Sequence, residues 1–372
     1  MRGVNRLRHR TPNMTKRFLL DVAHTCAVMA ESTAPSSPCR EYPMDQLVLD
    51  AFDAAALIPG FRAPQLPHEQ PAPSTLDAAD RAMRHWTSTV SGPLPPGSDV
   101  HRQEMCRMFR ETFNPYRPAV LAWPQLEAAT LKRIVDLPIW DIAVQTEGRA
   151  RLRMAAYAAT LDTPDLRDAL ALNAWEENRH KEVLSRMVHA YGIALASEPS
   201  YVYPKDTERA YLVTGYSECI DSFFAFGLFE VARRSGLFPP ALTETFEPVM
   251  QEECRHILLF ANWVAWHRAR LSWWQRIRFE LKVAGVWAFL VWERIGLARA
   301  IDAEGNVHEH DNNFTVNGAQ SVTDVDISVP ELMQLCLQEN ERRFVGYDPR
   351  LLRPETMPRL VRFGLKFVRR KK

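Results

Sequence analysis

Apolar residues recur three or four positions apart over long stretches of this chain, which is the spacing of an amphipathic helix. Turn signals separate these stretches: Pro164 follows a short polar segment, and Gly236 is followed by two prolines. The pattern predicts an all-α chain, a four-helix bundle with additional packing helices. We expect helices over residues 45–58, 76–90, 102–113, 125–137, 140–160, 164–191, 208–235, 241–270, 272–300 and 328–344, and a basic amphipathic end over residues 357–372.

The connection over residues 192–207 is long, contains two prolines and has no apolar period. It can stretch to roughly 53 Å, whereas a 28-residue helix is about 42 Å long, so it can run the length of the bundle as one long crossover. We divide the chain into an N-terminal extension (1–43), lead-in helices and proline-rich connectors that cover the bundle (44–139), the four-helix bundle (140–270), a packing helix (271–304), and a loop, short helix and basic end (305–372).

Two five-residue segments of the predicted bundle repeat one pattern. They read EENRH over residues 176–180 and EECRH over residues 252–256, and they contain the only two Glu-x-x-His pairs in the sequence. Residues three apart on a helix lie on one face, about 5 to 6 Å from each other. Each pair can therefore present a carboxylate and an imidazole to a metal ion, as in the dinuclear sites of helical bundles.

A carboxylate on each partner helix stands close to the level of these pairs. Glu147 and Glu177 lie 14 and 13 residues from the turn between their helices, about 20 Å along each axis. Glu218 and Glu253 lie 17 and 13 residues from theirs, and a bend at Pro248 can absorb the difference of about one turn. Glu147 and Glu218 are therefore predicted to face the two pairs.

Six side chains make up the predicted dinuclear metal site. Its ligands are Glu147, Glu177, His180, Glu218, Glu253 and His256. Four carboxylates buried without cations would carry a prohibitive desolvation cost, whereas two divalent ions neutralise them. Carboxylates combined with imidazoles favour iron or manganese over zinc. Glu230 is excluded because it stands only 5 residues from its turn.

The residues beside the ligands repeat as well. A ligating histidine usually donates its second N–H to a carboxylate, and Glu176 and Glu252 can each reach the histidine of the other helix. Arg179 and Arg255 can then hold these two acids. Asp221, on the third helix of the bundle, competes for the same role. The alternative is that these residues form salt bridges on the helix surface.

The repeated pattern resembles that of carboxylate-bridged di-iron proteins of the ferritin-like superfamily, notably soluble acyl-carrier-protein desaturases, ribonucleotide reductase small subunits and bacterial multicomponent monooxygenases. The string EENRH is especially similar to the desaturases, and the resemblance covers roughly residues 140–268. It implies a ferritin-like four-helix bundle, two iron ions (or a manganese–iron pair) held by the six ligands, and reductive activation of O₂. It does not extend to the substrate.

Two departures narrow the resemblance. Arylamine N-oxygenases of this superfamily carry a further ligand histidine four residues before the second motif's glutamate, where this chain has Val249. Rubrerythrins carry a Cys-rich rubredoxin module, which this sequence lacks. We therefore expect an enzyme that oxidises a small organic or lipid-like substrate with electrons from a separate donor protein. The alternatives are a ferritin-like protein that handles iron or peroxide without an organic substrate, and a scaffold whose metals are only structural.

Net charge and cysteine content bear on the partners of the protein and on its cellular location. The net charge of +1 gives no general attraction to nucleic acid, so we expect no nucleic-acid partner. The six cysteines form no C-x-x-C pair, which fits a cytoplasmic protein better than a disulfide framework. Residues 1–43 are Arg-rich and contain an apolar run, and we interpret them either as a disordered extension or as a targeting peptide.

Three further features leave alternatives open. Small residues near two ligands can leave an apolar cavity beside the metals or only allow close helix packing; they are Ala143, Ala150, Gly215, Ser222 and Ala225. The Trp-rich helix over residues 272–300 can pack on the bundle or contact a membrane interface. The basic end over residues 357–372 can be a solvated tail or bind an anionic membrane or an acidic partner, and a homodimer also stays open.

Overall fold

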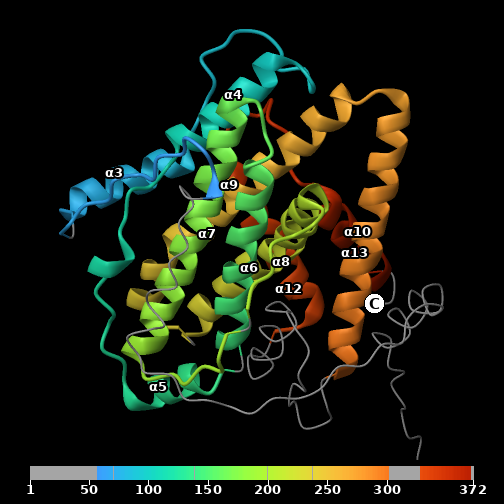
Figure 1. Cartoon of the computed structure of the whole chain (residues 1–372). Coiled ribbons are helices and arrows are strands. Elements are labelled where there is room, and N and C mark those ends of the chain that lie inside the picture. Colours follow the sequence, from blue (N-terminus) through green and yellow to red (C-terminus); the bar gives the residue numbers. More distant parts are fainter. Residues whose placement is uncertain are drawn as a thin grey trace, which may run out of the picture.

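The computed structural model describes residues 57–369 except residues 70, 138, 199, 237 and 301–326; the side chains of residues 295–300, 368 and 369 are also left out. The described part of the chain is helical and contains no β-strand, which confirms the predicted all-α class (Figure 1). One isolated parallel bridge joins Trp86 to Tyr347. Among the described residues, no helix has the length and apolar character needed to cross a membrane.

The helices follow the predicted order, with ends that shift by a few residues. They are α3 (Pro73–Arg84), α4 (Asp99–Glu111), the 3₁₀ helix η2 (Pro118–Val120), α5 (Ala128–Val135), α6 (Trp140–Ala158), α7 (Pro164–Ala190), α8 (Thr207–Ser235), α9 (Pro240–Arg270), α10 (Trp273–Ala300), α12 (Val329–Phe344) and α13 (Thr356–Arg369). The helix predicted over residues 45–58 lies outside the described residues except at its end.

Four long helices form the centre of the molecule. α6 packs against α7 and α8, and α9 packs against α8 and α7, so each has two neighbours within the set. The described residues of the connection between α7 and α8 contain no helix. Pro248 lies inside α9, which nevertheless continues from Pro240 to Arg270. The four helices therefore face one another across a shared interior.

Local sequence explains where several helices begin and end. α7 begins at Pro164, whose fixed φ suits the first helical position. α8 ends at Gly236, which adopts a φ of +70°, a left-handed conformation that glycine tolerates best. α12 begins with a reciprocal capping box between Ser328 and Glu331. Each signal is present in the sequence, so these ends are well predicted.

The lead-in helices differ more from the predicted ranges. α3 ends at Arg84, earlier than predicted, because the chain becomes extended and the N–H of Trp86 donates to the carbonyl of Gly346. α4 begins earlier than predicted because the Ser98 hydroxyl accepts the N–H of His101 and caps the helix. A tertiary contact and a cap determine these ends, and the pattern of apolar residues predicts neither of them.

Outer helices cover the bundle on different sides. α4 packs on α7 and α9, while α10, α12 and α13 pack on α8. In Figure 1, α3 and α4 lie on one side of the molecule, and α10 and α13 lie on the other. The outer helices therefore cover the bundle from both of these sides.

Candidate metal centre

Four of the predicted ligands form a compact cluster where α7 and α9 face each other. One ligand atom from each of Glu177, His180, Glu253 and His256 lies within 4.8 Å of the others. Glu177 and both histidines are at most 1% exposed. The two imidazole rings are stacked with centroids 5.3 Å apart. The Glu-x-x-His spacing thus places a carboxylate and an imidazole from each helix around one point.

The inner nitrogen of each histidine lies close to a carboxylate of the opposite helix. Nδ1 of His256 is 2.7 Å from Oε1 of Glu177, and Nδ1 of His180 is 3.1 Å from Oε1 of Glu253. Even so, both Nδ1 atoms and Glu177 Oε1 are buried and lack a partner in hydrogen-bond geometry. Buried polar atoms that converge without satisfying one another indicate a place for an ion.

Glu147 and Glu218 approach the same place from α6 and α8. Oε2 of Glu147 lies 3.9 Å from Nδ1 of His180. Both carboxylate oxygens of Glu218 are buried without a hydrogen-bond partner. Burial, followed by the charge of Glu177, raises the pKa of the Glu147 and Glu218 carboxyls well above their usual value. The structure therefore brings all six predicted ligands to one site.

The acids that precede the ligands hold the outer nitrogens of the histidines. Nε2 of His180 lies 2.8 Å from Glu252, and Nε2 of His256 lies 2.9 Å from Glu176. Each acid thus crosses to the histidine of the other helix. Both acids are 0% exposed, so the alternative of salt bridges on the helix surface does not hold for them.

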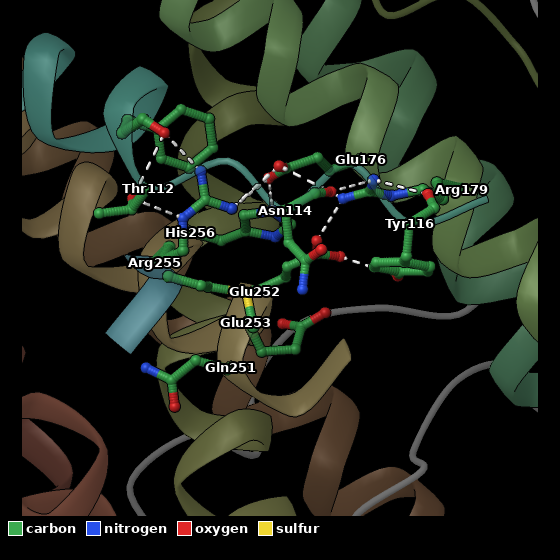
Figure 2. Close-up of polar contacts among 12 residues, drawn as sticks. Thr112, Asn114, Tyr116, Glu176, Arg179, Gln251, Glu252, Glu253, Arg255 and His256 are labelled. Atoms are coloured by element: carbon green, nitrogen blue, oxygen red, sulfur yellow. Dashed lines mark hydrogen bonds and ion pairs between the residues drawn. The ribbon is translucent and has the colours of Figure 1, made fainter. Parts of the chain in front are cut away.

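Two buried arginines pair with these acids. Nη1 of Arg255 donates to both oxygens of Glu176, at 2.9 and 3.0 Å. Arg179 pairs with Glu252 and also lies 3.6 Å from Glu176. Two acids and two arginines therefore form one row of charges, from Arg255 through Glu176 and Arg179 to Glu252 (Figure 2).

The segment between α4 and α5 supplies contacts that the sequence pattern did not reveal. The Tyr116 hydroxyl donates to Glu252 at 3.0 Å, and the Thr112 hydroxyl accepts from Nε of Arg255 at 2.8 Å (Figure 2). This part of the chain was predicted only to cover the bundle. The sequence contained only an indirect signal. A buried guanidinium has five N–H donors, one carboxylate cannot accept them all, and the remaining acceptors must come from another segment.

Asp221 was considered as a carboxylate that orients one of the histidines, but it pairs with α10 instead. Its carboxylate is 2.6 Å from Nη2 of Arg294 on α10 and accepts a hydrogen bond from Ser217. Glu176 and Glu252 already hold the outer nitrogens of both histidines. Asp221 therefore joins α8 to α10 and does not orient a histidine.

The charges around the histidines determine where protons are held when no cation is bound. Burial lowers the pKa of His256, but its two carboxylate partners outweigh burial and raise this pKa to about 9. The carboxylate partners of His180 likewise raise its pKa well above the usual value, against the effect of burial. Burial raises the pKa of Glu176, yet Arg255 and His256 bring it down to about 2. Without a cation, these carboxylates therefore favour the protonated form of both imidazoles, and Arg255 and His256 favour the charged form of Glu176.

Metal affinity should consequently rise with pH. A cation must displace the proton from Nδ1 of each histidine, and the protons of Glu147 and Glu218, whose pKa values are raised. These protons are bound at pH values below the raised pKa values, so binding should strengthen as the pH rises toward about 9, the pKa of His256. Calorimetric titration with Mn²⁺ in two buffers of different ionisation enthalpy measures affinity and proton release together. A constant affinity without proton release would contradict this prediction.

A mostly apolar cavity adjoins the carboxylates. It has a volume of about 250 Å³ and lies between α6, α7, α8 and α9. From the level of Glu218 its lining continues along α8 to Ala232, a distance of about 21 Å at 1.5 Å per residue. The far end is lined by large apolar side chains, among them Trp140, Met187, Leu242 and Phe246. A molecule in the cavity can touch the carboxylates at one point and apolar side chains elsewhere.

The small residues near the ligands serve both of the purposes considered for them. Four of them line the cavity: Ala143, Ala150, Ser222 and Ala225. Gly215 instead allows close packing, because a Cβ atom there would lie 2.2 Å from the ring of Phe260. The cavity is therefore a consequence of small side chains on α6 and α8.

The site fits a pair of divalent cations in charge and in donor chemistry. Four carboxylates balance the charge of two such ions, and the atoms left without hydrogen bonds include Nδ1 of both histidines and both oxygens of Glu218. No protein-family model, curated protein or solved structure matches the chain significantly. The functional argument therefore rests on the geometry of the site.

Proposed function

We propose that this protein is a ferritin-like di-iron oxidoreductase that activates O₂ to oxidise an organic substrate, with electrons from a separate donor protein. The observation that carries the proposal is the cluster of Glu177, His180, Glu253 and His256 on α7 and α9, with Glu147, Glu218 and a mostly apolar cavity beside it. A manganese–iron pair fits the same ligands. The long connection between α7 and α8 and the pairing of the four helices support a ferritin-like bundle.

The residues of the chain have distinct tasks in this proposal. Bound iron supplies the redox chemistry with O₂. Glu176 and Glu252 accept the outer N–H of each histidine, which fixes the ring orientation and makes the inner nitrogen a better ligand. Arg255 keeps Glu176 ionised, and Arg179 pairs with Glu252. The carboxylates of the six candidate ligands would offset the positive charge of the ions. They are Glu147, Glu177, Glu218 and Glu253.

The cavity favours an organic substrate over the alternative of iron or peroxide handling. Passage of an ion or peroxide calls for polar groups, whereas the lining between Ala225 and Ala232 on α8 is apolar over about 10 Å. Such a lining holds an apolar molecule and keeps water away from the reacting atoms. The substrate is therefore a small organic or lipid-like molecule.

Iron-loaded protein should consume O₂ repeatedly when a ferredoxin and its reductase supply electrons. A protein that only oxidises iron would take up O₂ once, in proportion to the Fe(II) added, and then stop. Ala225→Phe should fill the cavity without removing a ligand, so it should keep its iron and lose most substrate-dependent uptake. An oxygen electrode with elemental analysis measures both. Uptake that saturates with Fe(II) and ignores the reductase would overturn the proposal.

A further inference from the structure

The helix α10 carries apolar side chains on two opposite faces. Its inner face is buried on the bundle and consists of Phe279, Val283, Val286 and Leu290. Its outer face exposes Trp274 (68%), Leu281 (69%) and Trp292 (59%), together with Ile277. At about 100° per residue these four outer residues form one stripe roughly 27 Å long, on the side opposite the inner face. A surface helix normally buries one apolar face and exposes a polar one, so the second apolar stripe of α10 calls for a partner.

The helix α13 repeats this arrangement. It packs on α12 and α8, and its exposed residues Leu360, Phe363 and Phe367 fall on one stripe that faces away from them. The rings of Phe363 and Phe367 are in contact, with centroids 4.9 Å apart. Single exposed apolar residues are common, but a continuous stripe of aromatic rings marks an interaction surface.

Positive charge borders both stripes. Arg359, Arg362 and Lys366 are exposed on α13, and the sequence of α13 contains no acidic residue. Arg276 and Arg278 are exposed beside the start of the stripe on α10. Both helices pack on α8 and lie on the same side of the bundle in Figure 1. We call the two exposed stripes and these five basic residues the outer face.

We propose that the outer face docks on a membrane surface that contains anionic lipids. Trp and Phe rings beside Arg and Lys suit the boundary between lipid headgroups and acyl chains. Anionic headgroups complement a basic face, and each Lys or Arg near such a surface contributes attraction. A second copy of the chain is a poorer occupant, because a two-fold interface would bring the basic residues of α13 close to those of its partner.

The outer face and the cavity meet on α10. Glu293, the residue after Trp292, is part of the cavity lining. Docking through α10 would therefore bring one end of the cavity close to the membrane surface. The docking proposal itself does not depend on the metal site, since none of the residues of the outer face belongs to the six candidate ligands.

Vesicle flotation of the full chain tests this proposal. Protein should bind vesicles of phosphatidylcholine mixed with phosphatidylglycerol, bind vesicles of phosphatidylcholine alone more weakly, and lose the difference at high salt. Two double variants, F363S/F367S and W274S/L281S, should each reduce binding about tenfold or more. Because the pairs lie on different helices, misfolding of one, checked by its melting curve, leaves the other informative.

The matched control removes exposed apolar residues outside the outer face. Val202 and Val345 are 83% and 78% exposed, so V202S/V345S should bind vesicles as the unchanged chain does. Absence of binding to the anionic vesicles would overturn the proposal, as would equal binding by the control and both double variants. A dimer in light scattering that both double variants dissociate, without vesicle binding, would assign the outer face to a second copy and also overturn it.

Discussion

Replacing Glu177 by alanine should remove most of the metal that the protein binds. Glu177 is 1% exposed and its Oε1 lies 2.7 Å from Nδ1 of His256, among the atoms that converge on the site. Alanine leaves His256 without the carboxylate that faces its inner nitrogen, and His180 without the carboxylate of its own pair. Elemental analysis of protein expressed with iron should find about two iron or manganese ions per chain in the unchanged protein, and well below about one in the variant. One zinc ion, or no metal, in the unchanged protein would contradict the site.

The Glu177→Ala variant should also lose the stabilisation that metal provides. After burial, the charge of Glu177 is the main reason why the pKa values of Glu147 and Glu218 are raised. Its removal relieves this repulsion but also takes away a carboxylate that attracts the charge of His256, so the effect of metal is measured within each protein, with and without added metal. A ligand at a hundred times its Kd stabilises the folded state by about 2.7 kcal/mol. Added metal should therefore raise the melting temperature of the unchanged protein but not that of the variant.

Glu230→Ala is the matched control for this experiment. Glu230 is also a buried glutamate, on α8, but it pairs with Arg233 and Arg234 at 2.6 Å each. Its loss should cost stability and leave the metal content unchanged. If both variants lost metal equally, the level of a carboxylate along its helix would not select the ligands.

The level of each carboxylate was predictable because a helix advances by a fixed distance per residue. Counting from the turn matches Glu147 with Glu177 almost residue for residue. The count leaves Glu218 and Glu253 about one turn apart, and this offset persists: Glu253 accepts a hydrogen bond from Ser222, one turn after Glu218. Glu218 is nevertheless close enough that, after burial, the charges of Glu177 and Glu253 raise its pKa, and α9 continues through Pro248 without a break.

Contacts made by segments without a helical spacing of apolar residues were not predictable in the same way. Tyr116 lies outside the helices, between two prolines, and nothing in its spacing connects it with Glu252, 136 residues further along the chain. The same holds for Asp221, whose partner Arg294 lies on a helix that was predicted to pack somewhere on the bundle. Helical spacing determines which residues share a face, but the path of a loop and the docking of an outer helix depend on tertiary packing.

The crossed pairs between acids and histidines explain why two neighbouring glutamates occur in each motif. Glu177 faces the inner nitrogen of His256, while Glu176 holds its outer nitrogen from the other side. Each arginine also pairs with the acid of the other motif. Arg255 pairs with Glu176, and Arg179 pairs with Glu252. Each motif therefore contains two candidate ligands, a glutamate and a histidine, and the acid that holds the histidine of the other motif.

Glu252→Gln should lower metal affinity by roughly 10 to 100-fold while the chain stays folded. Glutamine keeps the size and the hydrogen bonding of the side chain, but it removes the charge that makes His180 a stronger ligand and that balances the buried Arg179. Metal titration beside the unchanged protein measures the loss.

Glu247→Gln separates this effect from a general loss of stability. Glu247 lies on the same helix and pairs with Arg343, which is also buried, at 3.0 Å, but it contacts neither histidine of the site. Its replacement should lower the melting temperature and leave metal affinity unchanged, because the charge it removes does not act on a ligand. Equal affinities for both variants and the unchanged protein, with equal O₂ consumption, would limit Glu252 to a structural ion pair. The six ligands would then have to hold their ions without help from the acids behind the histidines.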